Sequence, residues 1–162
     1  MDDCPRIAEI HVFGWRHAYR EFISPDYLFS KMTVKNSENK FREYLGAETG
    51  TSETFVYENG NIIKGFMTIG NSRDEDKNSE TFELHGIYVD PLFQGKGVGT
   101  ELVNFCTARA KKQNRTEIIL WVFKKNENTK KFYKKTGFMP DGKSKILETF
   151  NEKAVRYIKK IE

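Results

Sequence analysis

Three glycines at alternate positions, Gly95, Gly97 and Gly99, lie between a predicted strand and a predicted helix, and they constrain the fold more than any other feature. The strand is expected over Thr81–Asp90 and the helix from Val98 to about Asn114. Glycines at such a junction let the backbone approach a ligand closely, and the first N–H groups of the helix lack partners within it. The segment therefore favours an anionic ligand, above all a phosphate.

Two common phosphate-binding motifs do not match this segment. A Walker A loop requires Gly-Lys followed by Ser or Thr, whereas Lys96 is followed by Gly97. A dinucleotide fingerprint requires a third glycine three positions after the second, and those positions hold Thr100 and Leu102. A tight turn that binds no ligand is the remaining alternative to a phosphate site of another kind.

A second motif lies downstream, where Asn126 precedes a predicted helix over about Glu127–Lys135 that carries Tyr133. Gly137 follows as the expected left-handed C-terminal cap of this helix. Between the two motifs, Glu117–Phe123 is predicted as an apolar strand. The order strand, loop, helix, strand implies a parallel crossover between the two strands.

The remaining predicted elements complete a single α/β domain over residues 1–162. Apolar residues spaced by three and four, Ala8, Val12, Trp15 and Tyr19, predict a first helix from Pro5 to about Phe22. A short helix is predicted over Tyr27–Met32 and a partly helical stretch over Glu38–Leu45. A hairpin of Thr54–Tyr57 and Ile62–Ile69, with Asn59-Gly60 as its turn, is followed by a loop over Gly70–Glu80. At the C-terminal end we predict a turn at Pro140-Asp141-Gly142 and closing antiparallel strands over Lys143–Thr149 and Ala154–Ile161.

Composition and charge exclude several classes of protein. Apolar runs fall far short of the roughly 20 residues that cross a bilayer, and the acidic N-terminus is unlike a secretory signal. Cys4 and Cys106 form neither a metal-type pair nor a disulfide framework, so we expect reduced thiols, a cytoplasmic location and no metal. Six Lys and one Glu over residues 124–135 suit an anionic ligand, either a nucleic acid or a small polyphosphate.

Two motifs together carry a family resemblance. Their residues are Gln94, Gly97 and Gly99 after Val89-Asp90-Pro91, and Asn126, Tyr133 and Gly137-Phe138. In this order and separation they resemble the GNAT superfamily, the Gcn5-related N-acetyltransferases. The resemblance covers essentially the whole chain, and residues 82–138 carry most of it. It implies a GNAT-like α/β fold, with a mixed, mostly antiparallel sheet, a central pair of parallel strands that splay apart, and flanking helices.

The resemblance also implies a reaction and a cofactor. It is that of an N-acetyltransferase, in which a primary amine attacks the thioester of acetyl-CoA directly in a ternary complex. The pyrophosphate of acetyl-CoA is then assigned to Gln94, Gly95, Lys96, Gly97, Val98, Gly99 and Thr100, and the pantetheine arm to backbone groups of Ile87, Tyr88 and Val89 and to the side chain of Asn126. An ordinary helix cap explains Asn126 as well, and the lysines around the motifs could pair with phosphates or be merely solvated.

Catalytic roles follow from the same resemblance. Tyr133 matches the tyrosine that protonates the leaving thiolate, with a core aromatic as the alternative. Glu83 stands at the position where some family members have the general base. A carboxylate that acts as a base needs a raised pKa. A solvated carboxylate at the sheet edge, or one that contacts the ammonium of the substrate, would explain Glu83 equally well. His85, on the same strand face, is the second candidate because its ordinary pKa lies near neutrality. Trp121 replaces the glutamate of the acetyltransferases that act on ribosomal protein N-termini, which disfavours that subfamily and leaves water as a third candidate.

The acceptor amine is not identified by the sequence. Trp15 and Tyr19 belong to the helix that closes over the acceptor site in the family, or to the core. The acidic segment 73–77 favours a cationic acceptor or is a solvated loop. Two other functions compete, namely a catalytically silent acyl-CoA-binding or sensor domain and a nucleic-acid-binding module; the absence of an RNA or DNA motif disfavours the second. A homodimer through the closing strands is left open.

Overall fold

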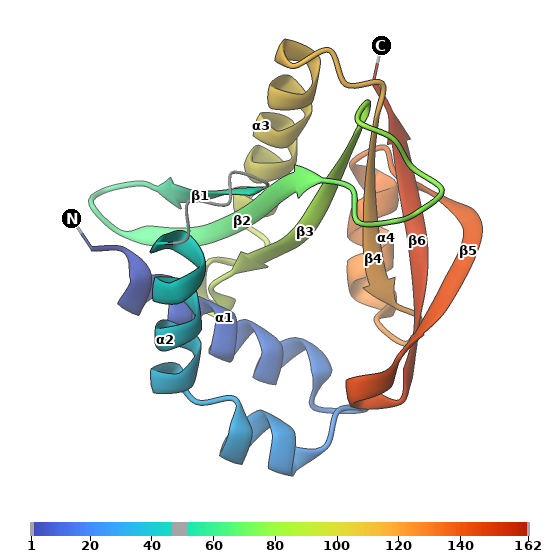
Figure 1. Ribbon diagram of the computed structural model, residues 1–162. Coiled ribbons are helices and arrows are strands. Elements are labelled where there is room, and N and C mark those ends of the chain that lie inside the picture. The colour runs from blue at the N-terminus through green and yellow to red at the C-terminus, as the bar shows by residue number, and fades with distance from the viewer. Residues whose placement is uncertain (1, 47–51, 162) are drawn as a thin grey trace. The chain divides into compact units, whose positions relative to one another are not determined.

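The computed structural model describes residues 2–46 and 52–161. Its helices and strands follow one another as α1 (Cys4–Tyr19), a short π-helix (Asp26–Lys31), α2 (Val34–Gly46), β1 (Ser52–Glu58), β2 (Ile63–Asn71), β3 (Thr81–Val89), α3 (Val98–Lys112), β4 (Glu117–Phe123), α4 (Glu127–Lys135), β5 (Met139–Leu147) and β6 (Glu152–Lys160) (Figure 1). Short 3₁₀ turns lie at Pro91–Phe93 and Glu148–Phe150. Each predicted helix and strand is present, in the predicted order.

The six strands form one sheet in the order β1-β2-β3-β4-β6-β5. β3 and β4 pair in parallel, with Thr81 opposite Glu117 and Glu83 opposite Ile119. β4 pairs with β6 and β5 pairs with β6 in antiparallel register. The predicted mixed, mostly antiparallel sheet with one parallel pair and flanking helices is therefore confirmed.

The chain forms two compact units, and each is described by itself. The first comprises residues 1–68 and 87–102, and the second comprises residues 69–86 and 103–162. β2, β3 and α3 contribute residues to both units, so neither unit is a continuous segment of the chain. The single domain over residues 1–162 stays a prediction.

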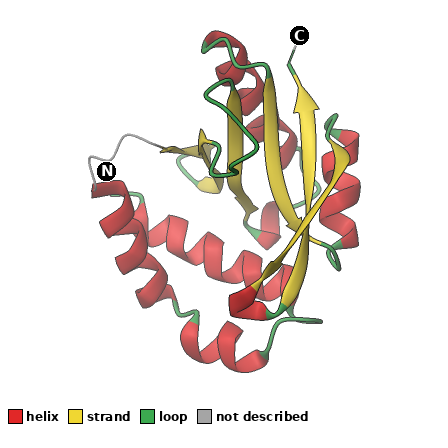
Figure 2. Cartoon of the chain, turned by 45° about the vertical axis from the view of Figure 1, so that its right-hand side comes forward, coloured by secondary structure: helices red, strands yellow, loops and turns green. Residues whose placement is uncertain are grey.

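Apolar faces of α1 and β2 form the core of the first unit. Ile7 and Ile10 of α1 pack with Ile63 and Phe66 of β2. α1 and α2 lie side by side (Figure 2), and His11 of α1 is enclosed there, with its Nδ1 2.9 Å from Ser37 Oγ. Burial and, to a lesser degree, the charge of Lys40 lower the pKa of His11 to about 4, so this ring is neutral at pH 7.

The predicted helix over residues 98–114 is confirmed as α3, which ends at Lys112. Its buried side chains form one helical face and are those of Val98, Leu102, Val103, Cys106 and Ala110, whereas Phe105 is 47% exposed. Adjacent helical residues project about 100° apart, so Phe105 lies off the buried face that Cys106 occupies.

None of the helices within residues 2–46 and 52–161 is both long and apolar enough to span a membrane.

The hairpin of β1 and β2 has its turn one residue later than predicted. Gly60 and Asn61 occupy the two central positions, with φ of 64° and 58°. The N–H of Asn59 donates to the carbonyl of Ile62 at 3.1 Å, which closes the turn. Two central residues with positive φ match the twist of a hairpin, and Asn tolerates this conformation nearly as well as Gly.

The predicted turn at Pro140-Asp141-Gly142 is wrong, because β5 already begins at Met139. The register against β6 shifts between Pro140 and Ser144, and Gly142 has φ of 87° within this β-bulge. Proline without an N–H and glycine with positive φ suit a bulge as well as a turn. β5 ends at Leu147 rather than Thr149, because a 3₁₀ turn leads through Asn151, with φ of 49°, into β6.

Candidate functional site

The end of β3 is held in place within the first unit by Asp90. Its backbone N–H donates to the carbonyl of Lys64 at 3.0 Å, and its Oδ1 accepts from the N–H of Leu92 at 2.8 Å. Its other carboxylate oxygen forms an ion pair with Arg6 of α1. Arg6 also donates from Nε to the carbonyl of Ile63 at 3.1 Å. These bonds connect α1, β2 and the turn that precedes the glycine loop to one another.

The glycine loop has an open side. Gly95 and Gly97 have φ of 72° and 86°, and a Cβ placed on either would meet no described atom within 4 Å. Gln94 donates from Nε2 to the carbonyl of Val89 at 3.2 Å. The carbonyl of Gly97 accepts from the N–H of Glu101 at 3.0 Å, so Gly97 is the N-cap of the 15-residue helix α3, which begins at Val98. The N–H groups of residues 98–100 precede this first helical bond and point along the axis toward the loop.

A glycine that the sequence analysis did not single out brings the loop close to the sheet. A Cβ on Gly65 of β2 would lie 2.9 Å from the carbonyl oxygen of Tyr88 and 3.1 Å from Cγ1 of Val98. Only glycine therefore allows β2, the end of β3 and the first turn of α3 to pack this tightly. An isolated glycine inside a strand pattern is the signal that could have shown this close approach.

Trp15 and Tyr19, the predicted acceptor-binding residues, lie in an aromatic cluster of the first unit. Their rings are 4.7 Å apart and edge-to-face, and both side chains are half-buried. Trp15 donates from Nε1 to the hydroxyl of Tyr88 at 3.2 Å, and its ring is 6.0 Å from that of Tyr27. The structure thus brings Trp15, Tyr19 and Tyr88 together and adds Tyr27, which the sequence analysis missed.

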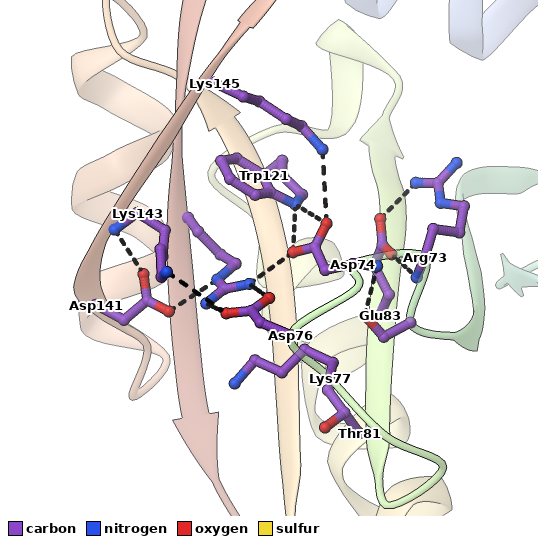
Figure 3. A network of polar contacts seen from close by, with 12 residues as sticks. Arg73, Asp74, Asp76, Lys77, Thr81, Glu83, Trp121, Asp141, Lys143 and Lys145 are labelled. Atoms are coloured by element: carbon purple, nitrogen blue, oxygen red, sulfur yellow. Dashed lines mark hydrogen bonds and ion pairs between the residues drawn. The ribbon is translucent and has the colours of Figure 1, made fainter.

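Glu83 of the second unit is buried, with 1% exposure, so the solvated edge carboxylate is wrong. Its Oε2 accepts from the backbone N–H of Arg73 at 2.9 Å, and its Oε1 forms an ion pair with the Arg73 guanidinium (Figure 3). Burial raises the pKa of Glu83, but the hydrogen bonds and charge of Arg73 outweigh burial, and the net shift is downward. The raised pKa that base work requires is absent at this carboxylate.

His85 lies two residues further along β3 and is half-buried. Its Nε2 is 3.4 Å from the carbonyl oxygen of Asn71. Burial, and next the charge of Arg73, lower the pKa of His85 below its ordinary value of 6.5. The ring is consequently neutral at pH 7 and can accept a proton on a ring nitrogen.

Asn126 and Tyr133 lie at opposite ends of α4. The Oδ1 of Asn126 accepts from the N–H of Thr129 at 3.2 Å, which is a helix cap. Its Nδ2 is buried and has no hydrogen-bond partner among the residues that the structure describes. The ring of Tyr133 is 5% exposed and packs 5.6 Å from that of Phe138. Gly137, with φ of 92°, ends the helix as predicted.

The predicted site residues divide between the two units. The first unit contains Trp15, Tyr19, Ile87 to Val89 and the glycine loop, and the second unit contains Glu83, His85, Asn126 and Tyr133.

Within the described residues, no group of three or more His, Cys, Asp or Glu side chains could hold a metal ion. Cys4 and Cys106 are free thiols, and burial raises the pKa of Cys106 to about 12.

A polar network around Arg156 was missed by the sequence analysis. Arg156 of β6 donates to Asp74 and Asp76 at 2.8 and 2.7 Å, and to Asp141 at 2.8 Å. Trp121 of β4 donates from Nε1 to both carboxylate oxygens of Asp74 (Figure 3). The hydrogen bonds from Arg156 lower the pKa of Asp76 to about 2. The segment that precedes β3 is thus bound to β6 through Asp74 and Asp76, although Arg73, Glu75 and Asp76 of this loop are exposed.

Known proteins resemble this chain in sequence and in fold. The model of the acetyltransferase (GNAT) family matches residues 10–138. An uncharacterized N-acetyltransferase of Methanocaldococcus jannaschii is 46% identical over 59 residues, which are 36% of this chain and 26% of that protein. The L-amino acid N-acyltransferase MnaT of Escherichia coli is 24% identical over 85% of this chain and 74% of its own length.

Among solved structures, the PaiA N-acetyltransferase of Thermoplasma acidophilum in complex with coenzyme A has the same fold. Its TM-score is 0.76 at 20% sequence identity, and the match covers 98% of this chain and 92% of that chain.

Proposed function

This chain belongs to the GNAT acetyltransferase family, and from this premise we propose that it transfers the acetyl group of acetyl-CoA to a primary amine. The observation that carries the proposal is the open glycine loop at the N-terminus of α3, where Gly97 leaves room for an anion beside the N–H groups that precede the first helical hydrogen bond. The buried Nδ2 of Asn126, which has no partner among the described residues, supports a ligand that presents an acceptor group there.

The residues that would hold acetyl-CoA carry complementary chemistry. The N–H groups at the start of α3 and the charge of Lys96 suit a pyrophosphate. The backbone of Ile87 to Val89 suits an extended pantetheine arm, and the amide of Asn126 suits one of its carbonyls. When bound, acetyl-CoA supplies the thioester, and the transfer forms an N–C bond as the C–S bond breaks and CoA thiol leaves.

This chain's own residues supply two proton transfers. We assign to Tyr133 the proton that the leaving sulfur takes up, because its hydroxyl is carried on the helix that Asn126 begins. We assign to His85 the proton that the attacking amine gives up, because its lowered pKa keeps the ring neutral. Glu83 stays charged against Arg73 and positions the segment before β3. Trp15 and Tyr19 are assigned to the acceptor.

Replacing Gly97 by Ala is expected to raise KM for acetyl-CoA roughly tenfold, because a side chain at φ of 86° strains the loop away from its anion-binding shape. The measurement is CoA thiol release with a panel of primary amines. Gly60→Ala is the matched control, since Gly60 has φ of 64° and equally open surroundings in the β1–β2 turn. Failure of the wild-type chain to release thiol with every amine, despite binding acetyl-CoA, would instead identify a silent acyl-CoA-binding domain.

The pH dependence of the rate tests His85. We divide kcat/KM of the wild-type protein by kcat/KM of His85→Gln at each pH. The titration of the amine substrate affects both values equally and cancels, so the pH dependence of the ratio reports the titration of His85. Because the pKa of His85 is lowered, this ratio should rise from one in acid to its plateau with a midpoint below pH 6.5. We expect a plateau of roughly ten, below the hundredfold typical of a general base, because water can also take the proton. A ratio of one at all pH values would remove His85 from the mechanism.

A further inference from the structure

An ammonium group of the chain itself occupies a corner formed by Trp121 and Asp74. The Nζ of Lys145 lies 3.9 Å from the centroid of the Trp121 ring and 3.7 Å from Oδ1 of Asp74. Trp121 donates from Nε1 to the two carboxylate oxygens of Asp74 at 3.1 and 3.0 Å, which fixes ring and carboxylate relative to each other. Figure 3 shows the end of Lys145 directed at this Trp121–Asp74 corner.

The Trp121–Asp74 corner lies on the same sheet face as the candidate base. Ile119, two residues before Trp121 on β4, is the parallel partner of Glu83. Side chains two apart on a strand share a face, so Trp121 follows Ile119 on the Glu83 face, about 7 Å further along β4. His85 shares that face with Glu83 by the same alternation. The corner, Glu83 and His85 all belong to the second unit.

The chemistry of the corner suits a charged amine rather than a reacting one. A carboxylate and the face of an indole both stabilise an ammonium over a neutral amine. An ammonium has no lone pair and cannot attack a thioester, so an amine held there is a spectator in the transfer. An acceptor that uses the corner must therefore carry a second amine.

Lys145 is suited to give up its place. Its side chain is 43% exposed, whereas that of Asp74 is 12% exposed. Arg156 also pairs with Asp74 at 2.8 Å, so the carboxylate would keep a cationic partner if the Lys145 ammonium moved into water. The exchange replaces one alkylammonium by another of the same chemistry.

We propose that the Trp121–Asp74 corner binds the non-reacting ammonium of an aliphatic diamine acceptor, and that Lys145 is the resident competitor that this acceptor displaces. The inference rests on the proposed acetyl transfer and adds the acceptor class to it. The corner makes the distal charge of the acceptor, rather than the attacking amine, the feature that is recognised.

Lys145→Ala is expected to lower KM for cadaverine about fivefold and to leave KM for pentylamine unchanged, since only cadaverine has a second ammonium. Lys143→Ala is the matched control, because Lys143 lies two residues away on β5, is 62% exposed and pairs with Asp76 at 3.9 Å. It should leave both values unchanged. The gain in affinity on removing a charged residue is a result that structural damage would not produce.

Trp121→Leu should raise KM for cadaverine about fivefold while KM for acetyl-CoA and for pentylamine stays constant. Trp121→Phe keeps a ring face, and its effect should be smaller. Equal KM values for cadaverine and pentylamine, or an unchanged cadaverine KM in Lys145→Ala, would overturn the inference and leave acetyl transfer intact. Absence of thiol release with every amine would instead overturn the proposed function. Acetylation of Lys145 itself by wild-type protein, detected by mass spectrometry, would contradict its role as a displaced spectator.

Discussion

Replacing Tyr133 by Phe should lower kcat by about a hundredfold or more and change KM for acetyl-CoA by no more than about twofold. The phenyl ring keeps the packing 5.6 Å from Phe138 and 5.3 Å from Phe132, so the change removes the hydroxyl and leaves these ring contacts in place. Without it, the thiolate of CoA must leave unprotonated or wait for water. The measurement is thiol release at saturating acetyl-CoA and amine.

A second buried tyrosine provides the control for Tyr133. Tyr157 of β6 is 3% exposed and lies in the same unit. Tyr157→Phe should change kcat by less than about twofold, because the proposed mechanism assigns no proton transfer to its hydroxyl. A Tyr133→Phe rate equal to that of Tyr157→Phe would make Tyr133 a core aromatic. Matching thermal unfolding curves would exclude loss of folded protein as the cause of a low rate.

Arg156→Met should lower the free energy of unfolding by about 3 kcal/mol, because the change leaves Asp74, Asp76 and Asp141 without their shared partner. The side chain of Arg156 is 4% exposed, so water compensates little for the lost ion pairs. For a chain of this size the corresponding fall in Tm is about 6 to 12 °C. Denaturant unfolding followed by circular dichroism measures the difference.

The control for Arg156 is an arginine with two carboxylate partners at the surface. Arg42 pairs with Asp2 and Glu38, but its side chain is 45% exposed. Arg42→Met should lower the free energy of unfolding much less than Arg156→Met does, because water screens exposed pairs. Equal losses in the two variants would show that the Arg156 network contributes no more than surface pairs do. Arg156→Lys should fall between them, since lysine keeps the charge and loses the planar fork.

Local signals determined which elements the sequence could predict. α4 begins and ends at the predicted residues because Asn126 caps one end and Gly137 the other. The bulge in β5 was misassigned because Pro140, Asp141 and Gly142 suit a turn equally well, and only pairing with β6 decides between the two. The start of α3 at Val98, on which the proposed phosphate site depends, was predicted from the helical spacing of the residues that follow the glycine loop.

Contacts between distant residues were beyond the reach of the sequence. Arg156 is separated from Asp74 and Asp76 by 82 and 80 residues, and no local pattern marks three aspartates as its partners. For the same reason the direction of the Glu83 pKa shift was not predicted, since it depends on how the preceding segment places Arg73. The roles of Glu83, His85 and Tyr133 in catalysis stay predictions.

The bulge in β5 also affects how the sheet meets other molecules. β5 is the last strand in the order of the described sheet, and such an edge is where strands of neighbouring molecules add. Here Pro140 offers no N–H, the bulge breaks the spacing of the hydrogen-bonding groups, and Lys143 and Lys145 would bring like charges together in a paired copy. Although Met139 and Ile146 are exposed, we expect this edge to disfavour the addition of a strand from a neighbouring molecule in concentrated solution.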